Sequence, residues 1–227
     1  MAERLAHTTE KRLSLSPRKR LAKKARLRWK RVRKSFKSLR DPQAFARGQR
    51  ALATLQKHED QGKLALSYFD EAGLALDPTI PYAWQEPKSV IELPARRSGR
   101  INVLGCMHRQ NDLHTSMFEQ SIHTGVVIAC FDAFCRTITK KTVVVVDNAS
   151  IHRSEAFEDR VPYWKQHGLI IKYLPPYSPE LNLIEILWRR IKYDWLPFSA
   201  SACLHAMIEA LDDILSHVGS TYQITFA

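Results

Sequence analysis

The sequence predicts an α/β protein in which a mixed β-sheet is flanked by helices and follows a basic N-terminal extension. Apolar runs of strand length recur along residues 61–200, and helical patterns separate most of them, as in a sheet covered by helices. The positive charge lies elsewhere. Residues 1–50 hold 18 of the 35 Lys and Arg but only 3 of the 23 Asp and Glu, which leaves 17 basic and 20 acidic residues in the rest.

The basic extension is densest in residues 11–40, where Trp29 and Phe36 lie among the charges. Clustered Lys and Arg displace counterions from a polyanion, and aromatic rings can add stacking. We therefore predict that this stretch binds the phosphate backbone of DNA, while a solvated arm or a membrane-surface segment are the alternatives. The residues predicted to bind DNA are Arg18, Lys19, Arg20, Lys23, Lys24, Arg26, Arg28, Lys30, Arg31, Arg33 and Lys34.

No apolar run reaches the ~18 residues of a membrane span, and the first residues do not have the apolar core of a signal peptide. We therefore expect no membrane partner and a cytoplasmic protein, associated with the nucleoid. The chain is expected to divide into a basic arm with a helix (1–60), a catalytic domain (61–200) and a C-terminal helix and tail (201–227).

The first elements follow from periodicity. Apolar residues at helical spacing predict a helix over 42–61, and alternation predicts a strand over 64–73 that stops at Asp70. Residues 98–107 and 112–119 have the pattern of two further strands, which form a hairpin. Residues 125–138 are predicted to form an apolar helix.

The second half predicts two strands and three helices. The run TVVVVD (142–147) is apolar enough for a central strand buried on both faces. A helix is expected from Ser154, bent or broken near Pro162, and then a short strand over 169–174. The next helix is expected to begin with Ser178 as its N-cap, and the last to cover 201–218.

Three carboxylates are candidates for a shared site. Asp70 and Asp147 are expected at the carboxyl ends of strands, the edge where α/β sheets collect ligands. Glu185 lies at the margin of the apolar stripe of its helix. A turn or cap role for each Asp, and an ion pair with Arg189 for Glu185, are the alternatives. Together, the three would suit Mg²⁺, and two such ions can drive a phosphoryl displacement.

Four motifs, in this order, resemble the DDE transposases of the mariner superfamily, in particular its bacterial insertion-sequence branch. They are YFDEAG (68–73), IPYAWQ (80–85), VVVVDNASIH (143–152) and YLPPYSPELNLIEILWRRIK (173–192). The resemblance covers roughly residues 27–198. It implies a ribonuclease-H-like fold with Asp70, Asp147 and Glu185 as catalytic metal ligands, and with Asn148, His152 and Asn182 at accessory positions.

The resemblance also implies an activity. Such enzymes cut phosphodiester bonds at transposon ends and join the freed 3′-hydroxyl to target DNA, using Mg²⁺ or Mn²⁺, with two ions expected. The implied partners are double-stranded DNA and a second copy of the chain. A ribonuclease-H-like nuclease without strand transfer is an alternative. So is an idle DNA-binding remnant, because the residues before Asp70 are too few for the helix-turn-helix domains of relatives.

The sequence leaves alternative roles for three aromatic side chains. His152 is expected to contact DNA, to orient a carboxylate or to be packed. Trp84 and Tyr177 are expected either to stack on extruded bases or to pack within the protein.

Overall fold

The computed structural model describes residue 24 and residues 37–77 and 99–226 of the chain. Residues 37–227 form one compact unit. Within its described part, no helix combines the length and the apolar character that crossing a membrane would require.

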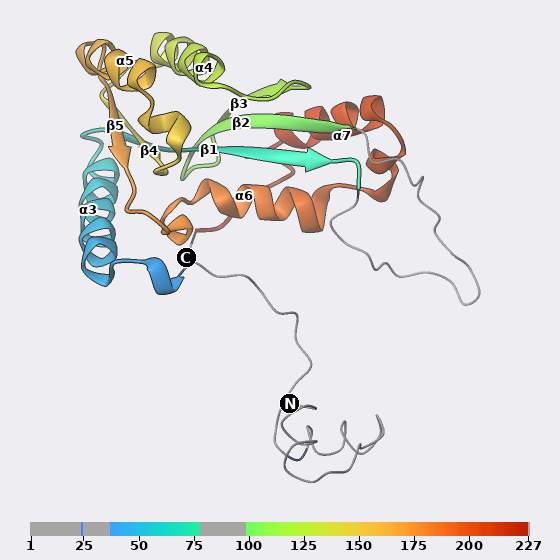
Figure 1. The fold of residues 1–227 in the computed structure, drawn as a ribbon, viewed down its shortest axis with the longest axis horizontal. Helices are drawn as coiled ribbons and strands as arrows, with labels where there is room; N and C mark the ends of the chain where they lie inside the picture. The colour runs from blue at the N-terminus through green and yellow to red at the C-terminus, as the bar shows by residue number, and fades with distance from the viewer. Residues whose placement is uncertain (1–23, 25–36, 78–98, 227) are drawn as a thin grey trace. The chain divides into compact units, whose positions relative to one another are not determined.

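A five-stranded mixed sheet forms the centre of this unit (Figure 1). Its strand order is β3-β2-β1-β4-β5, with antiparallel pairing among the first three strands and parallel pairing from β1 to β4 to β5. The prediction of a mixed sheet with a hairpin is confirmed. The strands are β1 (Ala65–Ala75), β2 (Arg100–His108), β3 (Leu113–Phe118), β4 (Thr142–Val146) and β5 (Leu169–Tyr173).

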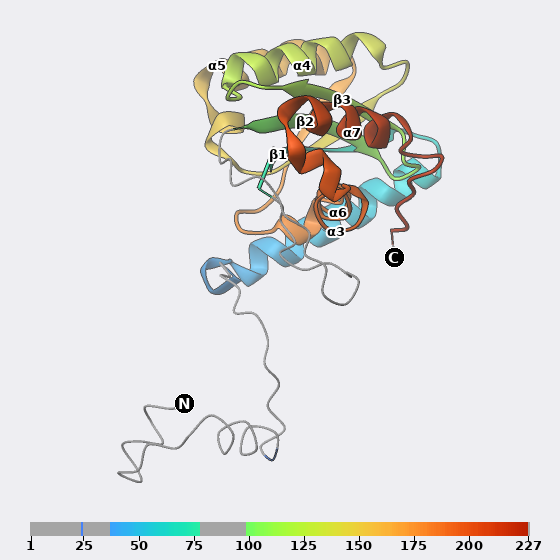
Figure 2. The same cartoon turned by 90° about the vertical axis from the view of Figure 1, so that its right-hand side faces the viewer.

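Helices cover both faces of the sheet. Figures 1 and 2 show α4 and α5 on one face and α6 on the other. The buried side chains of α3, α6 and α7 join one apolar cluster, and those of α4 and α5 join a second. The helices are α3 (Pro42–Asp60), α4 (Thr124–Thr137), α5 (Glu155–Gln166), α6 (Ile184–Arg190) and α7 (Leu204–Ser216).

Strand β4 separates the two clusters. Val143 and Val145 pack in the cluster on the α6 face, whereas Val144 and Val146 pack in the cluster on the α4 face. All four are buried. This alternation follows from the two-residue period of a strand and confirms that β4 is central and buried on both sides.

Two helix predictions need correction. Helix α5 is not broken near Pro162: it continues to Gln166 and ends before Gly168, whose φ is +87°. Proline removes one backbone hydrogen bond from a helix. Here the buried Phe157 and Trp164, on either side of Pro162, hold both halves of α5 against the same apolar cluster.

The predicted helix from Ser178 starts later than expected. Pro179–Leu181 form a separate 3-10 turn, and Ser178 makes no side-chain cap. Asn182 then adopts an extended conformation (φ −97°, ψ 101°), so the α-helix begins only at Ile184. A π-helical turn (Ile191–Trp195) continues α6.

Candidate active site

The sheet places Asp70 and Asp147 at the same level. The last parallel pair between β1 and β4 joins Tyr68 to Val145. Asp70 and Asp147 each follow two residues later in their chains. Neighbouring parallel strands advance together, so the two carboxylates leave the sheet side by side where β4 ends.

Asp70 does not stand at the end of its strand, contrary to the prediction. Strand β1 continues to Ala75, because β2 remains paired with it beyond Asp70 on the other side. What ends near Asp70 is the pairing with β4. The site therefore lies where one neighbour of β1 stops and the other continues.

Alternation sets the face on which these carboxylates lie. Tyr68 and Ala72, two residues before and after Asp70, belong to the cluster on the α6 face. Phe69 belongs to the cluster on the α4 face. Side chains of a strand alternate between faces, so Asp70 projects toward the α6 face and Glu71 toward the α4 face.

Glu185 is the second residue of α6, and it lies at the exposed margin of this helix. The helix sits close to the sheet because β2 has a glycine opposite Asp70: Gly105. A Cβ atom at Gly105 would lie 2.8 Å from the Trp188 ring and 3.0 Å from Ile184. The absence of a side chain at Gly105 therefore allows α6 to approach β1 and β2 closely.

The three carboxylates influence one another. Burial raises the pKa of Asp70 to about 7, and the negative charges of Glu185 and Asp147 add to that rise. Partial burial also raises the pKa of Glu185, with Lys192 opposing the rise and Asp147 adding to it. Lys192, Asp147 and Asp70 thus interact electrostatically with Glu185, and no ion pair joins Glu185 to Arg189 among the described residues.

His152 supports Asp147 from the α4 face. It is 1% exposed, and its Nδ1 lies 2.8 Å from Oδ1 of Asp147. Its Nε2 faces Glu71 Oε1 at 3.5 Å but forms no hydrogen bond. Of the expectations for His152, the structure places it in contact with a carboxylate and packed between Phe69 and Phe157.

The contacts of His152 shift both partners. Burial alone would lower the pKa of His152, but the hydrogen bond to Asp147 and the attraction to the charges of Asp147 and Glu71 raise it to about 9. Burial alone would raise the pKa of Asp147. The bonds from His152 and from the N–H of Ala149 outweigh burial and hold that pKa below its ordinary value. Asp147 is therefore kept ionised.

Two accessory residues lie in different surroundings. Asn182 is 3% exposed and donates from Nδ2 to the carbonyl oxygen of Phe69 at 2.9 Å. Asn148 is exposed, and its Oδ1 accepts a 2.7 Å hydrogen bond from Nε of Arg153. The structure thus ties Asn182 to β1 and leaves Asn148 at the surface.

Tyr177 is 47% exposed and has a φ of +57°, so packing in the core is not its role. Trp84 lies outside the described residues, and so do the basic residues predicted to bind DNA, except Lys24. Base stacking by Trp84 and DNA binding by the basic residues therefore remain predictions.

Sequence reasoning did not select Glu71 and Gly105. The only local signal for Glu71 is a second acid directly after Asp70 inside a strand. Gly105 interrupts an otherwise apolar strand, which can mark a close approach of another segment.

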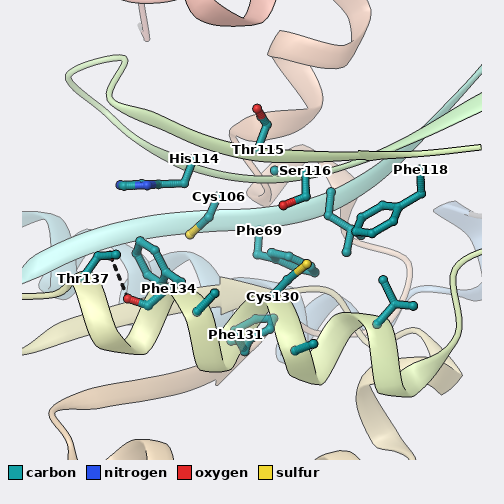
Figure 3. A pocket seen from close by; sticks show the side chains of 15 residues that line it. Phe69, Cys106, His114, Thr115, Ser116, Phe118, Cys130, Phe131, Phe134 and Thr137 are labelled. Atoms are coloured by element: carbon teal, nitrogen blue, oxygen red, sulfur yellow. Dashed lines mark hydrogen bonds between the residues drawn. The ribbon is translucent and has the colours of Figure 1, made fainter. Parts of the chain in front are cut away.

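A cavity of about 420 Å³ lies between α4 and strands β1–β3 (Figure 3). Its lining is largely apolar, with Phe69, Phe131 and Phe134 on its walls and the sulfur atoms of Cys106 and Cys130 nearby. None of the three carboxylates lines it. The cavity is therefore separate from the three carboxylates, and it adjoins the candidate site at Phe69 and Gly105.

A family model described as DDE superfamily endonuclease matches residues 65–208, more than half of the chain. The chain belongs to the DDE endonuclease superfamily. No curated protein sequence matches it.

Solved structures similar to this chain include several of Mos1 transposase. A paired-end complex with the left transposon end has a TM-score of 0.59 and 14% identity, covering 95% of this chain and 66% of that one. The Mos1 strand transfer complex has a TM-score of 0.58 and 12% identity, covering 93% and 64%. The chain thus spans just under two thirds of these Mos1 chains, and the likeness confirms the ribonuclease-H-like fold.

The donor chemistry of the DDE site fits a divalent cation. Carboxylate oxygens are the ligands that Mg²⁺ and Mn²⁺ prefer. Burial and the neighbouring negative charges raise the pKa of Asp70, and a bound cation would favour its ionised form. Among the described residues (37–77 and 99–226), however, no three Asp, Glu, His or Cys side chains lie close enough together to hold one ion. Binding would require Glu185 and the two aspartates to draw together.

Proposed function

We propose that this chain is a transposase that cuts DNA at transposon ends and transfers the freed strand to target DNA. The observation that carries the proposal is the alignment of Asp70 and Asp147 on adjacent strands, with Glu185 on the helix that covers the same face. The DDE family match and the fold shared with Mos1 transposase support it.

Asp70, Asp147 and Glu185 would hold the divalent ions, either Mg²⁺ or Mn²⁺, and two ions would suit the reaction. When bound, such ions supply Lewis-acid activation of the attacking oxygen and neutralise charge at the scissile phosphate. His152 keeps Asp147 ionised and oriented. Lys192, which acts electrostatically on Glu185, is placed to attract a DNA phosphate to the same face.

The test uses a supercoiled plasmid carrying the DNA that flanks the coding sequence, incubated with Mn²⁺ or Mg²⁺. We expect the protein to nick this plasmid and to join the ends to a second plasmid. Asp147→Ala should abolish both products; because it also removes the partner of the buried His152, its cooperative unfolding is measured to show that the variant is folded under the assay conditions. Asp212→Ala, at an exposed position of α7, is the matched control and should retain activity.

Two outcomes would contradict the proposal. Nicking that survives Asp147→Ala would show that the carboxylates are not the metal ligands. Nicking without joined products would identify a nuclease that does not transfer strands. We further propose that two copies act together on paired ends, which crosslinking in the presence of DNA would test.

A further inference from the structure

Asn182 connects the two structural elements that carry Asp70 and Glu185. Its Nδ2 donates a 2.9 Å hydrogen bond to the carbonyl oxygen of Phe69, the residue directly before Asp70. Its own carbonyl oxygen accepts a 3.2 Å hydrogen bond from the backbone N–H of Glu185. One buried residue thus contacts the immediate neighbour of the first carboxylate and the backbone of the third.

The backbone of Asn182 is shaped for this double contact. Its extended conformation separates the 3-10 turn Pro179–Leu181 from α6 and turns the side chain inward to β1. Its N–H donates to the carbonyl of Pro179 at 2.9 Å, so the residue is also fixed from the preceding turn. An uninterrupted helix from Pro179 would satisfy local preferences better. The interruption is therefore explained by the long-range contact to β1.

The Asn182 side chain is not the one that would give the folded protein its greatest stability. Oδ1 of Asn182 is buried and has no hydrogen-bond partner among the described residues. An unsatisfied buried acceptor is destabilising, because it has lost its hydrogen bonds to water without gaining another. A residue that served only to close the core would satisfy both ends of its amide or would be apolar.

We propose that Asn182 is a positioning residue that sets the location of Glu185 relative to Asp70, so that both can hold the same divalent ions. This inference rests on the proposed function, because it assigns Asn182 a role toward the metal site. Asn182 does not itself act on the DNA. Its effect passes through the placement of the two carboxylates.

The test compares metal binding with stability. Asn182→Ala removes both side-chain groups, and Asn182→Leu keeps the approximate volume without a donor, so at least one variant retains the packing. Asn111→Gly is the matched control: Asn111 also bonds a distant backbone, that of Ile224, and its φ of +66° suits glycine. The unfolding temperature of each variant is measured over a range of Mn²⁺ concentrations at fixed pH and salt.

A ligand that binds only the folded state stabilises it by RT ln(1 + [L]/Kd), so the unfolding temperature starts to rise when the ligand concentration reaches about the Kd. In the Asn182 variants, we expect the Mn²⁺ concentration at which this rise sets in to increase at least about tenfold, as for other residues that orient ligands. Asn111→Gly should lower the unfolding temperature and leave that concentration unchanged. Nicking by the Asn182 variants should recover at high Mn²⁺.

An unchanged Mn²⁺ response in both Asn182 variants would overturn the inference, as would an equal weakening in Asn111→Gly. Failure of the proposed function is distinguishable. In that case the wild type itself would show no Mn²⁺ stabilisation that Asp147→Ala removes, and no nicking.

Discussion

At the scale of single residues, the geometry of the candidate site depends on residues other than the three carboxylates. His152 holds Asp147, Asn182 joins β1 to α6, and Gly105 makes room for Trp188. The three candidate metal ligands could be selected from the sequence because acids after apolar runs are conspicuous. Their supports could be recognised as accessory positions at most, since hydrogen bonds such as that from Asn182 to Phe69 span 113 residues.

Gly105→Ala should destabilise the protein by about 1–3 kcal/mol, the usual cost of overpacking a core. The added methyl group would meet the Trp188 ring, and α6 would have to move away from β2. Urea unfolding at neutral pH measures this cost. In a Trp188→Phe background the ring is smaller, so the same substitution should cost less. An equal cost in both backgrounds would show that the ring is not what limits the space.

At the scale of elements, the strands and most helices could be predicted because their apolar periodicity is strong. The predicted ends of elements were wrong where contacts with a distant segment determine the backbone conformation. Strand β1 outlasts Asp70 because β2 pairs with it, and α6 starts late because Asn182 turns toward β1. The pairing partner β2 and the contact of Asn182 with β1 both lie far away in the sequence, so local sequence patterns do not contain them.

Helices α4 and α5 are joined by Asp132. Its carboxylate accepts hydrogen bonds from Arg160 at 3.0 and 3.1 Å and from Nε1 of Trp164 at 2.7 Å. Burial alone would raise the pKa of Asp132, but the bonds from Arg160 and Trp164 outweigh it and lower this pKa. A depressed pKa adds stability above the unfolded-state pKa of about 3.9, and this stability is lost as the pH falls through the folded-state pKa.

Asp132→Asn should therefore be less stable than the wild type at pH 7, by up to about 1 kcal/mol because the pair is partly exposed. The difference should shrink as the pH falls below about 5 and then through the depressed pKa of the wild-type carboxyl. Urea midpoints of both proteins across this range measure the effect. A difference that stays constant with pH would exclude the ionised carboxylate as its source.

At the scale of the whole molecule, the positive charge and the candidate site lie in different parts of the chain. Residues 51–227 hold fewer basic than acidic residues, whereas residues 1–50 are strongly basic. A carboxylate site repels DNA until cations neutralise it. The extension is therefore expected to supply much of the attraction for the phosphate backbone.

Replacing the basic residues between positions 18 and 34 by glutamine should weaken binding to duplex DNA of any sequence. It should also reduce the slope of log affinity against log salt concentration, because each lost phosphate contact removes about 0.9 from that slope. Fluorescence anisotropy of a labelled duplex at several salt concentrations measures both. A variant with weaker binding but an unchanged slope would assign these residues a role other than phosphate contact.

Asp70 and Glu71 are consecutive in β1, yet they serve opposite faces of the sheet: Asp70 faces α6, and Glu71 faces His152. A shift of one residue exchanges the faces of every side chain that follows in a strand. One inserted residue before Asp70 would bring Phe69 into its place, and one deleted residue would bring Glu71 there. Among active relatives, β1 should therefore vary in composition but not in length before this point.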